Sequence, residues 1–317
     1  MLEGMSEYWL CVGGANVDVQ GVTIARLLPG TSNPGHVQQA AGGVARNVAE
    51  NLGWLGQEVQ LFSLVGEDAD GEWLRHITAK SGVATHGMFL IPGKSTGRYL
   101  AIRDLDGDLY AAVADMDVNE AWTDALVQSG LQRLPQAAGL FMDANLPQMV
   151  MQTFLQEAKR LGKKVIVDPV SVKKAEKWRG MLNGVHLLIS SIDEIEQLSG
   201  QSLYSFYDVE RCARKLVEEG ISNVMVICGD AGLCLCDQNG SSWLPAPPNP
   251  IREAAGDAFA AGVIYAQNKA ASLAEQAAYG IALAELSTQQ TGMYDIDHLV
   301  NRKDFFASPK ISDRELG

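Results

Sequence analysis

One carboxylate stands at a place in the sequence that suits proton transfer. The segment PIREAAGDAFAAGV puts Asp257 directly after Ala254, Ala255 and Gly256 and ahead of an apolar run. These small residues leave backbone N–H groups uncovered, and we expect a helix to begin at about Asp257. Free amides at a helix N-terminus bind anions. An acid that accepts a proton from a hydroxyl, beside amides that stabilise a moving phosphoryl group, suits phosphoryl transfer.

The same segment has a simpler interpretation. Asp257 could serve only as the N-cap of the helix, and the small residues could allow close helix packing. Taken alone, the segment leaves both interpretations open.

A Gly-rich segment, GGVARN, is a candidate ligand-binding turn. The paired Gly42 and Gly43 allow a backbone to approach a ligand closely, and Asn47 lies one turn into the expected helix, where its amide could bond a hydroxyl. An ordinary strand-to-helix turn would have the same composition.

The segment GGANVDVQG places two polar side chains on one face of a strand end. Asn16 and Asp18 alternate with valines, so both side chains point the same way. Two hydrogen-bonding groups on one face suit a vicinal diol, although Asn and Asp also serve as turn residues.

Several common catalytic patterns are missing from the sequence. There is no GxxxxGK[ST] P-loop, no GxGxxG after the first expected strand and no GxSxG elbow, and the five histidines are not paired at metal-ligand spacing. A Rossmann-type oxidoreductase and a Ser/His/Asp hydrolase are therefore disfavoured.

The elements that must position these residues alternate between short apolar strands and helices. This order predicts an α/β fold with a mainly parallel sheet covered on both faces. Two segments, about 19–40 and 95–113, instead alternate apolar and polar residues, as antiparallel hairpins do. We expect a single domain, 1–317, in which these segments form a small β-sheet lid over a ligand crevice.

Composition narrows the class of protein further. The 317 residues are 47% hydrophobic and carry a net charge of −13, which argues against a nucleic-acid partner. We find no secretory signal and no apolar span long enough for a membrane, so no membrane partner is expected. Five scattered cysteines are not a disulfide framework, and they favour a reduced, cytoplasmic location.

Taken in order, these segments resemble the ribokinase/PfkB family of carbohydrate kinases over about residues 8–300. GGVARNVAENLGWLG resembles the N-terminal signature of the family and AAGDAFAAG its C-terminal signature. Between them, SLVGEDADG, VIVDPVS, SSIDEIEQLSG and VICGDAGL fall in the expected places. The resemblance implies a ribokinase-like three-layer α/β/α sandwich.

Within the family, five segments look most like the pseudouridine kinase branch: TSNPGHV, GGVARN, ADMDV, DANLP and DPVSVKK. This resemblance implies an ATP-dependent kinase that phosphorylates the 5′-hydroxyl of a ribosyl substrate, with pseudouridine favoured. The alternatives are a ribokinase-like or other nucleoside or sugar kinase, and a catalytically weak sugar- or nucleoside-binding protein.

The resemblance also implies roles for individual residues. Asp257 would be the base, and Ala254, Ala255 and Gly256 would form the anion hole. Residues expected on the substrate side are Asn16, Asp18, Gly42, Gly43, Asn47 and Asn145. Residues expected on the nucleotide side are Ser191, Glu194, Gly229 and Gly232, with Glu194 organising Mg²⁺ through water.

Three departures from the family pattern lie on the ATP side. Ser191 stands where relatives have Asn in Asn-x-x-Glu, and Ile227 stands where a Thr is common. Ile251, Arg252 and Glu253 replace the DTT in which Asp helps hold a monovalent cation, so a K⁺ requirement does not follow.

The lid is expected to decide which base is recognised and how the chain associates. Candidates for reading the base are Thr96, Arg98, Tyr99, Asp115 and Lys173. An exposed small sheet also invites pairing with a second copy, so a homodimer through the lid is expected.

Overall fold

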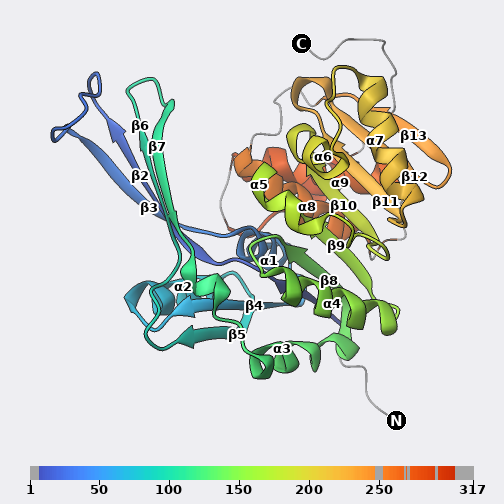
Figure 1. The fold of residues 1–317 in the computed structure, drawn as a ribbon, viewed down its shortest axis with the longest axis horizontal. Helices are drawn as coiled ribbons and strands as arrows, with labels where there is room; N and C mark the ends of the chain where they lie inside the picture. Colours follow the sequence, from blue (N-terminus) through green and yellow to red (C-terminus); the bar gives the residue numbers. More distant parts are fainter. Residues whose placement is uncertain (1–6, 247–252, 268, 270–271, 290–291, 304–317) are drawn as a thin grey trace.

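The computed structural model describes residues 7–246, 253–267, 269, 272–289 and 292–303. Its centre is a nine-stranded sheet in the order β13-β12-β11-β10-β9-β8-β1-β4-β5 (Figure 1). The pairs from β5 through to β11 are parallel, and β12 and β13 add antiparallel strands at one edge. The strands are β1 (Tyr8–Val12), β4 (Val59–Gly66), β5 (Ala84–Ile91), β8 (Ala137–Asp143), β9 (Lys164–Asp168), β10 (Leu187–Ser191), β11 (Asn223–Ile227), β12 (Leu233–Asp237) and β13 (Gly240–Leu244).

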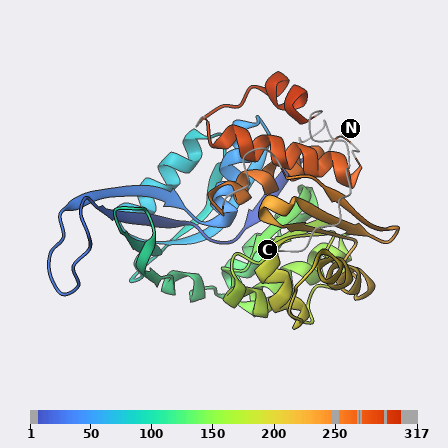
Figure 2. The ribbon, with the colours of Figure 1, turned by 90° about the horizontal axis from the view of Figure 1, so that it is seen from above.

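Helices cover both faces of this sheet, because its central strands are apolar on both sides. In β1, Trp9 and Cys11 join one core cluster while Leu10 and Val12 join the other. The first cluster is covered by α1 (Val44–Trp54), α2 (Ala69–Lys80), α8 (Glu253–Gln267), α9 (Leu273–Ser287) and α10 (Ile296–Lys303). The second is covered by α3 (Asp124–Leu131), α4 (Gln148–Arg160), α5 (Val172–Ala175), α6 (Ile192–Ser199) and α7 (Phe206–Glu218). Figure 2 shows the two helical layers with the sheet between them, which is the expected three-layer α/β/α arrangement.

A separate four-stranded sheet projects away from the large one (Figure 1). Its strands are β2 (Asn16–Thr23), β3 (Gly35–Gly42), β6 (Arg98–Arg103) and β7 (Leu109–Asp115), in the order β3-β2-β6-β7. The outer pairs are antiparallel hairpins, as expected, but β2 and β6 join them in parallel. The first hairpin begins at Asn16, so it includes the polar residues that the sequence assigned to a strand end.

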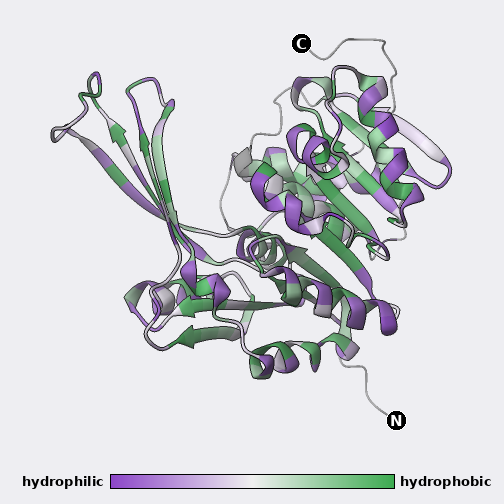
Figure 3. Cartoon of the chain, viewed as in Figure 1, coloured by the Kyte–Doolittle hydropathy of each residue, from purple (hydrophilic) through white to green (hydrophobic). Residues whose placement is uncertain are grey.

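The hydrophobic residues are concentrated in the large sheet. The strands of the large sheet are mostly hydrophobic, whereas the helices around them mix both kinds of residue (Figure 3). Within the described ranges, no helix combines the length and the apolar character needed to cross a lipid bilayer.

Candidate active site

The two signature segments meet where α1 and α8 lie side by side. Asn47, in the first turn of α1, donates from Nδ2 to Oδ2 of Asp257 on α8 at 2.8 Å. The two residues are 210 positions apart in the chain, and the fold alone brings them together. The carboxyl ends of parallel strands open toward this point, which is where α/β folds bind their ligands.

Helix α8 begins earlier than expected. Its first described residue is Glu253, so Asp257 lies one turn inside the helix instead of at its start. Alanine is the strongest helix former, and Ala254 and Ala255 therefore join the helix instead of leading into it. Because an N-cap lies outside the helix proper, the interpretation of Asp257 as a simple cap is wrong.

The expected anion hole falls in this first turn. The N–H groups of a first helical turn have no carbonyl partner within the helix, and Ala254 and Ala255 lie there. A Cβ placed on Gly256 would meet nothing within 4 Å, so the backbone at Gly256 borders open space. A phosphate could therefore approach this turn closely, and the anion-hole assignment stays a prediction.

The environment of Asp257 favours a proton acceptor that works near neutral pH. Asp257 as a whole residue is partly exposed to solvent. Its carboxylate is nonetheless buried, and this burial raises the pKa of the carboxylate to about 7. The hydrogen bond from Asn47 and the charge of Arg46 lower that pKa, while the carboxylates of Asp143 and Asp18 raise it. A base with a pKa close to the working pH is well matched to general base catalysis.

The expected sugar-binding residues lie at the base of the small sheet. Asn16 donates from Nδ2 to Oδ1 of Asp18 at 2.7 Å, so the two share one face as predicted. Gly42 pairs across from Asn16, and a Cβ at Gly42 would come within 2.3 Å of the Asp18 carboxylate. Gly43 has a φ of 98° and a Cβ there would lie 2.4 Å from the carbonyl oxygen of Gly14. Because neither glycine has a side chain, the end of β3 can pack directly against the Asp18 carboxylate and the Gly14 backbone.

Asp143, at the end of β8, is a buried carboxylate beside the candidate site that the sequence did not single out. The side chain is fully buried, and Oδ2 accepts from the backbone N–H groups of Gly14 (3.0 Å) and Ala45 (2.8 Å). Oδ1 accepts from the N–H of Asn145 at 2.8 Å. One carboxylate thus holds together the turn after β1, the start of α1 and the loop that carries Asn145.

Asn145 itself is positioned by a lysine. The Nζ atom of Lys174 donates to Oδ1 of Asn145 at 2.5 Å, and Lys174 is half-buried. Burial lowers the pKa of Lys174, whereas the nearby Asp143 carboxylate raises it. Lys174 lies next to Lys173, one of the five residues expected to read the base.

On the nucleotide side, Ser191 and Glu194 cap the start of α6. The Oγ atom of Ser191 accepts from the N–H of Glu194 at 3.3 Å, and Oε2 of Glu194 accepts from the N–H of Ser191 at 2.8 Å. Ser191 and Glu194 thus form a reciprocal capping box at the start of α6. Ile227 ends β11 and packs against the apolar core.

The loop expected to bind the nucleotide follows β11. Gly229 and Gly232 have φ angles of 56° and 98°, which favour glycine; Gly229 begins the short turn Gly229–Ala231 and Gly232 follows it. A Cβ on Gly232 would lie 2.1 Å from the carbonyl oxygen of Leu244, so the loop packs closely on β13. This geometry explains both glycines without defining the nucleotide contact.

Asp168, at the end of β9, faces Glu194 and is a second carboxylate that the sequence did not single out. Burial raises its pKa well above the usual value, and the charges of Glu194 and Asp257 raise it further. A divalent cation in this region would relieve that repulsion, so the residues suit Mg²⁺. Among the described residues, no three potential ligands gather closely enough to hold a metal directly.

The expectations for Arg252 and Glu253 and for Thr96 have different outcomes. Arg252 and the side chain of Glu253 lie outside the described residues. Thr96 is buried, and its Oγ1 donates to Asp68 at 2.6 Å and accepts from the N–H of Gly66 at 3.0 Å. Its hydroxyl is thus engaged at the root of the lid. Tyr99 pairs across from Asp18 and stays a base-reading candidate.

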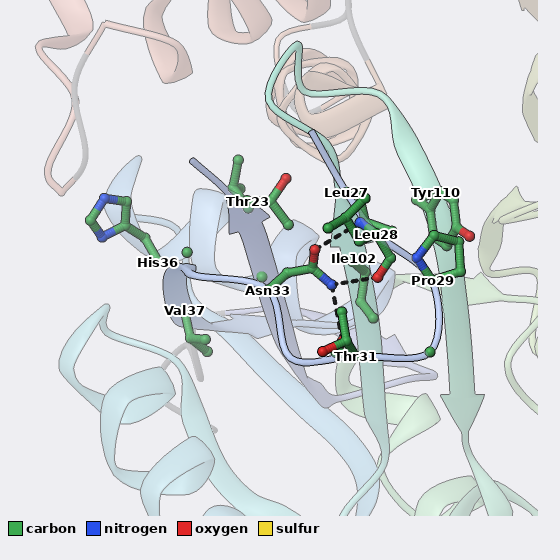
Figure 4. A pocket seen from close by; sticks show the side chains of 14 residues that line it. Thr23, Leu27, Leu28, Pro29, Thr31, Asn33, His36, Val37, Ile102 and Tyr110 are labelled. Atoms are coloured by element: carbon green, nitrogen blue, oxygen red, sulfur yellow. Dashed lines mark hydrogen bonds between the residues drawn. The ribbon is translucent and has the colours of Figure 1, made fainter. Parts of the chain in front are cut away.

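A cavity of about 380 Å³ lies at the far end of the lid (Figure 4). Asn33 shapes its wall, because its side chain bonds both backbone groups of Leu28 and the carbonyl of Thr31. Thr23 is five residues beyond Asp18 on β2, which is about 17 Å along a strand. The TSNPGHV segment therefore contributes to the lid tip and not to the site around Asp257.

Comparison with known proteins shows which protein family the chain belongs to. The family model described as "pfkB family carbohydrate kinase" matches residues 6–298. The chain is a PfkB family carbohydrate kinase. It is therefore a phosphotransferase that uses an alcohol group as acceptor, in a family that uses ATP.

Relatives of this kinase include sugar and nucleoside kinases. It is 35% identical to the pseudouridine kinase of Escherichia coli (strain K12) over 81% of this chain and 82% of the relative. It is 32% identical to an uncharacterized sugar kinase, YeiI, of the same organism, over 89% of this chain and 78% of the relative. A carbohydrate kinase from Agrobacterium tumefaciens matches its structure with a TM-score of 0.83 and 26% identity, over 95% of this chain and 98% of that one.

Proposed function

We propose that this kinase transfers the γ-phosphoryl group of ATP to the 5′-hydroxyl of a ribosyl substrate, and that pseudouridine is the preferred acceptor. The observation that carries the proposal is the contact between Asn47 and Asp257, because it joins the sugar-side segment to the proposed base. The similarity to a pseudouridine kinase supports the choice of acceptor.

The proposed chemistry follows from the position of each group. Asp257 takes the proton of the acceptor hydroxyl while the oxygen of that hydroxyl forms a bond to the γ-phosphorus. The bond between the γ-phosphorus and the oxygen that bridges it to the β-phosphorus breaks, and ADP is released. The amides of Ala254, Ala255 and Gly256 stabilise charge on the transferred group. Asn16, Asp18 and Asn145 orient the sugar hydroxyls.

ATP and Mg²⁺ belong to the other half of the proposed site. When bound, Mg²⁺ neutralises charge on the phosphates. Asp168 and Glu194 would hold its water shell, and the loop 229–232 would border the nucleotide.

The acceptor is tested with a panel assay. ADP release is measured with Mg²⁺–ATP and pseudouridine, uridine, ribose, adenosine or fructose 6-phosphate, each with and without K⁺. We expect the highest kcat/KM for pseudouridine. A higher value for ribose or another nucleoside would reassign the acceptor within the family. Tight nucleoside binding by calorimetry without turnover on any member would favour a binding protein.

The acidity of Asp257 predicts the pH dependence of the reaction. Only the deprotonated carboxylate can accept a proton, and its pKa is raised to about 7. We therefore expect kcat/KM to fall tenfold for each pH unit below about 7, and to level off above it, because this parameter reports the free enzyme. Activity that stayed constant down to pH 5 would contradict the assignment of a base with a raised pKa.

The chain is proposed to be one domain whose lid pairs with a second copy. On the lid face opposite Asp18, three exposed apolar side chains come from three of the four strands: Val37 on β3, Leu100 on β6 and Val113 on β7. A large apolar sheet face exposed to water favours burial against a partner, and a face-to-face sheet pair would provide it.

Sedimentation velocity tests the dimer. Leu100→Asp is expected to shift a dimer of the wild-type chain to monomer, because a carboxylate would be buried in the interface. Leu105→Asp is the matched control, since Leu105 is exposed in the turn of the second hairpin, off this face. A wild-type chain that sediments as a monomer at micromolar concentration would contradict the proposal.

A further inference from the structure

Arg46 is a buried cation in the middle of the site, and no step described so far uses it. It is 2% exposed, although arginine is seldom fully buried. Its Nη1 and Nη2 atoms donate to Oε1 and Oε2 of Glu50 at 3.0 and 2.7 Å, a two-pronged ion pair along α1. The guanidinium also reaches Asn47: Nε and Nη2 donate to its Oδ1 at 3.1 and 2.8 Å.

These bonds fix which way the Asn47 amide points. A guanidinium has only donors, so the atom of Asn47 that faces Arg46 must be the oxygen. The amide nitrogen then necessarily faces Asp257, where it donates to Oδ2 at 2.8 Å. Turning the amide over would set N–H groups against the guanidinium and a carbonyl oxygen against a carboxylate, and both contacts would be repulsive.

The charge of Arg46 acts in the same direction as these hydrogen bonds. Three carboxylates face Asp257 or lie close to it: Asp18, Asp143 and Asp168. Arg46 lowers the pKa of both Asp257 and Asp18 and so opposes the effect of burial. Glu50 holds the guanidinium in place from the far side.

We propose that Arg46 is a positioning residue for proton transfer: it fixes the Asn47 amide so that Nδ2 engages Oδ2 of Asp257, which assigns the proton-accepting role to Oδ1. The proposal rests on the proposed function of Asp257 as base. It adds a chain of three side chains, Glu50–Arg46–Asn47, that sets the orientation and the charge of that base.

Three variants at one position separate charge from geometry. Arg46→Met removes both, and we expect kcat to fall about 100-fold and the acid limb of the pH profile to move up by about one pH unit. Arg46→Lys keeps the charge but loses the planar fork, so kcat should fall about tenfold with the acid limb near its wild-type position. Arg46→Ala leaves a cavity, and added guanidinium ions should restore part of its kcat.

The controls separate this role from a structural one. Arg302→Met breaks an ion pair to the buried Glu285, on α9 and α10, and is expected to leave kcat and the pH profile unchanged. Thermal unfolding is followed for each variant. The titration of the Asp257 carboxyl by NMR, in the wild type and in Arg46→Met, gives a readout that needs no turnover.

The outcomes are distinguishable. An Arg46→Met protein that is folded, has kcat within twofold of wild type and an unchanged Asp257 titration would overturn the proposal. Loss of kcat with an unshifted titration and no rescue by guanidinium would show a purely structural role and would also overturn it. Full activity of Asp257→Asn would instead refute the proposed base, whatever the result at Arg46.

Discussion

Asp257→Asn is expected to lower kcat by about 1,000-fold while leaving acceptor binding nearly unchanged. Asparagine has almost the same size, so it can keep the contact with Asn47 by presenting its oxygen to Nδ2. Its other terminal atom is then an NH₂ group, which cannot take a proton from the acceptor hydroxyl. Steady-state kinetics gives kcat, and calorimetry with the acceptor gives Kd.

The control is the same substitution on a distant surface helix. Asp124 is exposed at the start of α3, and Asp124→Asn is expected to change neither kcat nor Kd. If Asp257→Asn retained more than a tenth of wild-type kcat, the proton would be taken by another group. If it lost acceptor binding to the same extent as kcat, Asp257 would be a binding residue.

The sequence predicted those parts of the site that depend on local composition. The Gly42–Gly43 turn at the start of α1 and the alternation of Asn16 and Asp18 follow from preferences that act over a few residues. The sequence singled out Asp257 on local composition too; its role stays a prediction, and its expected place at the start of the helix was wrong. Runs such as EAAG carry both a turn-like glycine and strong helix formers, and the packing of α8 against α1 and α9 decides in favour of the helix.

The remainder of the site depends on which strands are neighbours. Asp143 and Asp168 are single acids at the ends of apolar strands, and neither belongs to a motif with diagnostic spacing. Only the order β9-β8-β1 places Asp143 beside the turn after β1 and Asp168 beside Asp143. The sequence offered one signal that could have pointed to both residues, namely an acid at the carboxyl end of a buried parallel strand, because ligands bind at that edge of the sheet.

The role of Arg46 escaped the sequence for a related reason. In the sequence it is one letter within a Gly-rich signature, and its nearest charged neighbour, Glu50, looks like an ordinary helical pair at i,i+4. Its bonds to Asn47 and Glu50 lie within α1, and only the folded structure shows that its side chain is buried. The contact between Asn47 and Asp257 thus joins two helices that are far apart in the sequence, and no single segment encodes it.

Asp143→Ala is expected to lower the free energy of unfolding by about 3–5 kcal/mol. The substitution leaves the backbone N–H groups of Gly14, Ala45 and Asn145 without their common acceptor in a buried place. Asp143→Asn should cost nearly as much, because its NH₂ group must face at least one of those donors. Urea unfolding followed by circular dichroism gives the free energies.

Asp104→Ala is the matched control for this effect. Like Asp143, Asp104 accepts hydrogen bonds from backbone N–H groups, in its case the two of Asp106 and Asp108. These bonds lie in an exposed turn of the lid, where water can replace the carboxylate. It should therefore cost less than about 1 kcal/mol. Equal losses for the two alanine variants would mean that burial does not decide the strength of the Asp143 contacts. A stable Asp143→Ala protein would mean that the turn after β1 and the start of α1 hold their positions without the carboxylate, and that the sugar-binding geometry has another source.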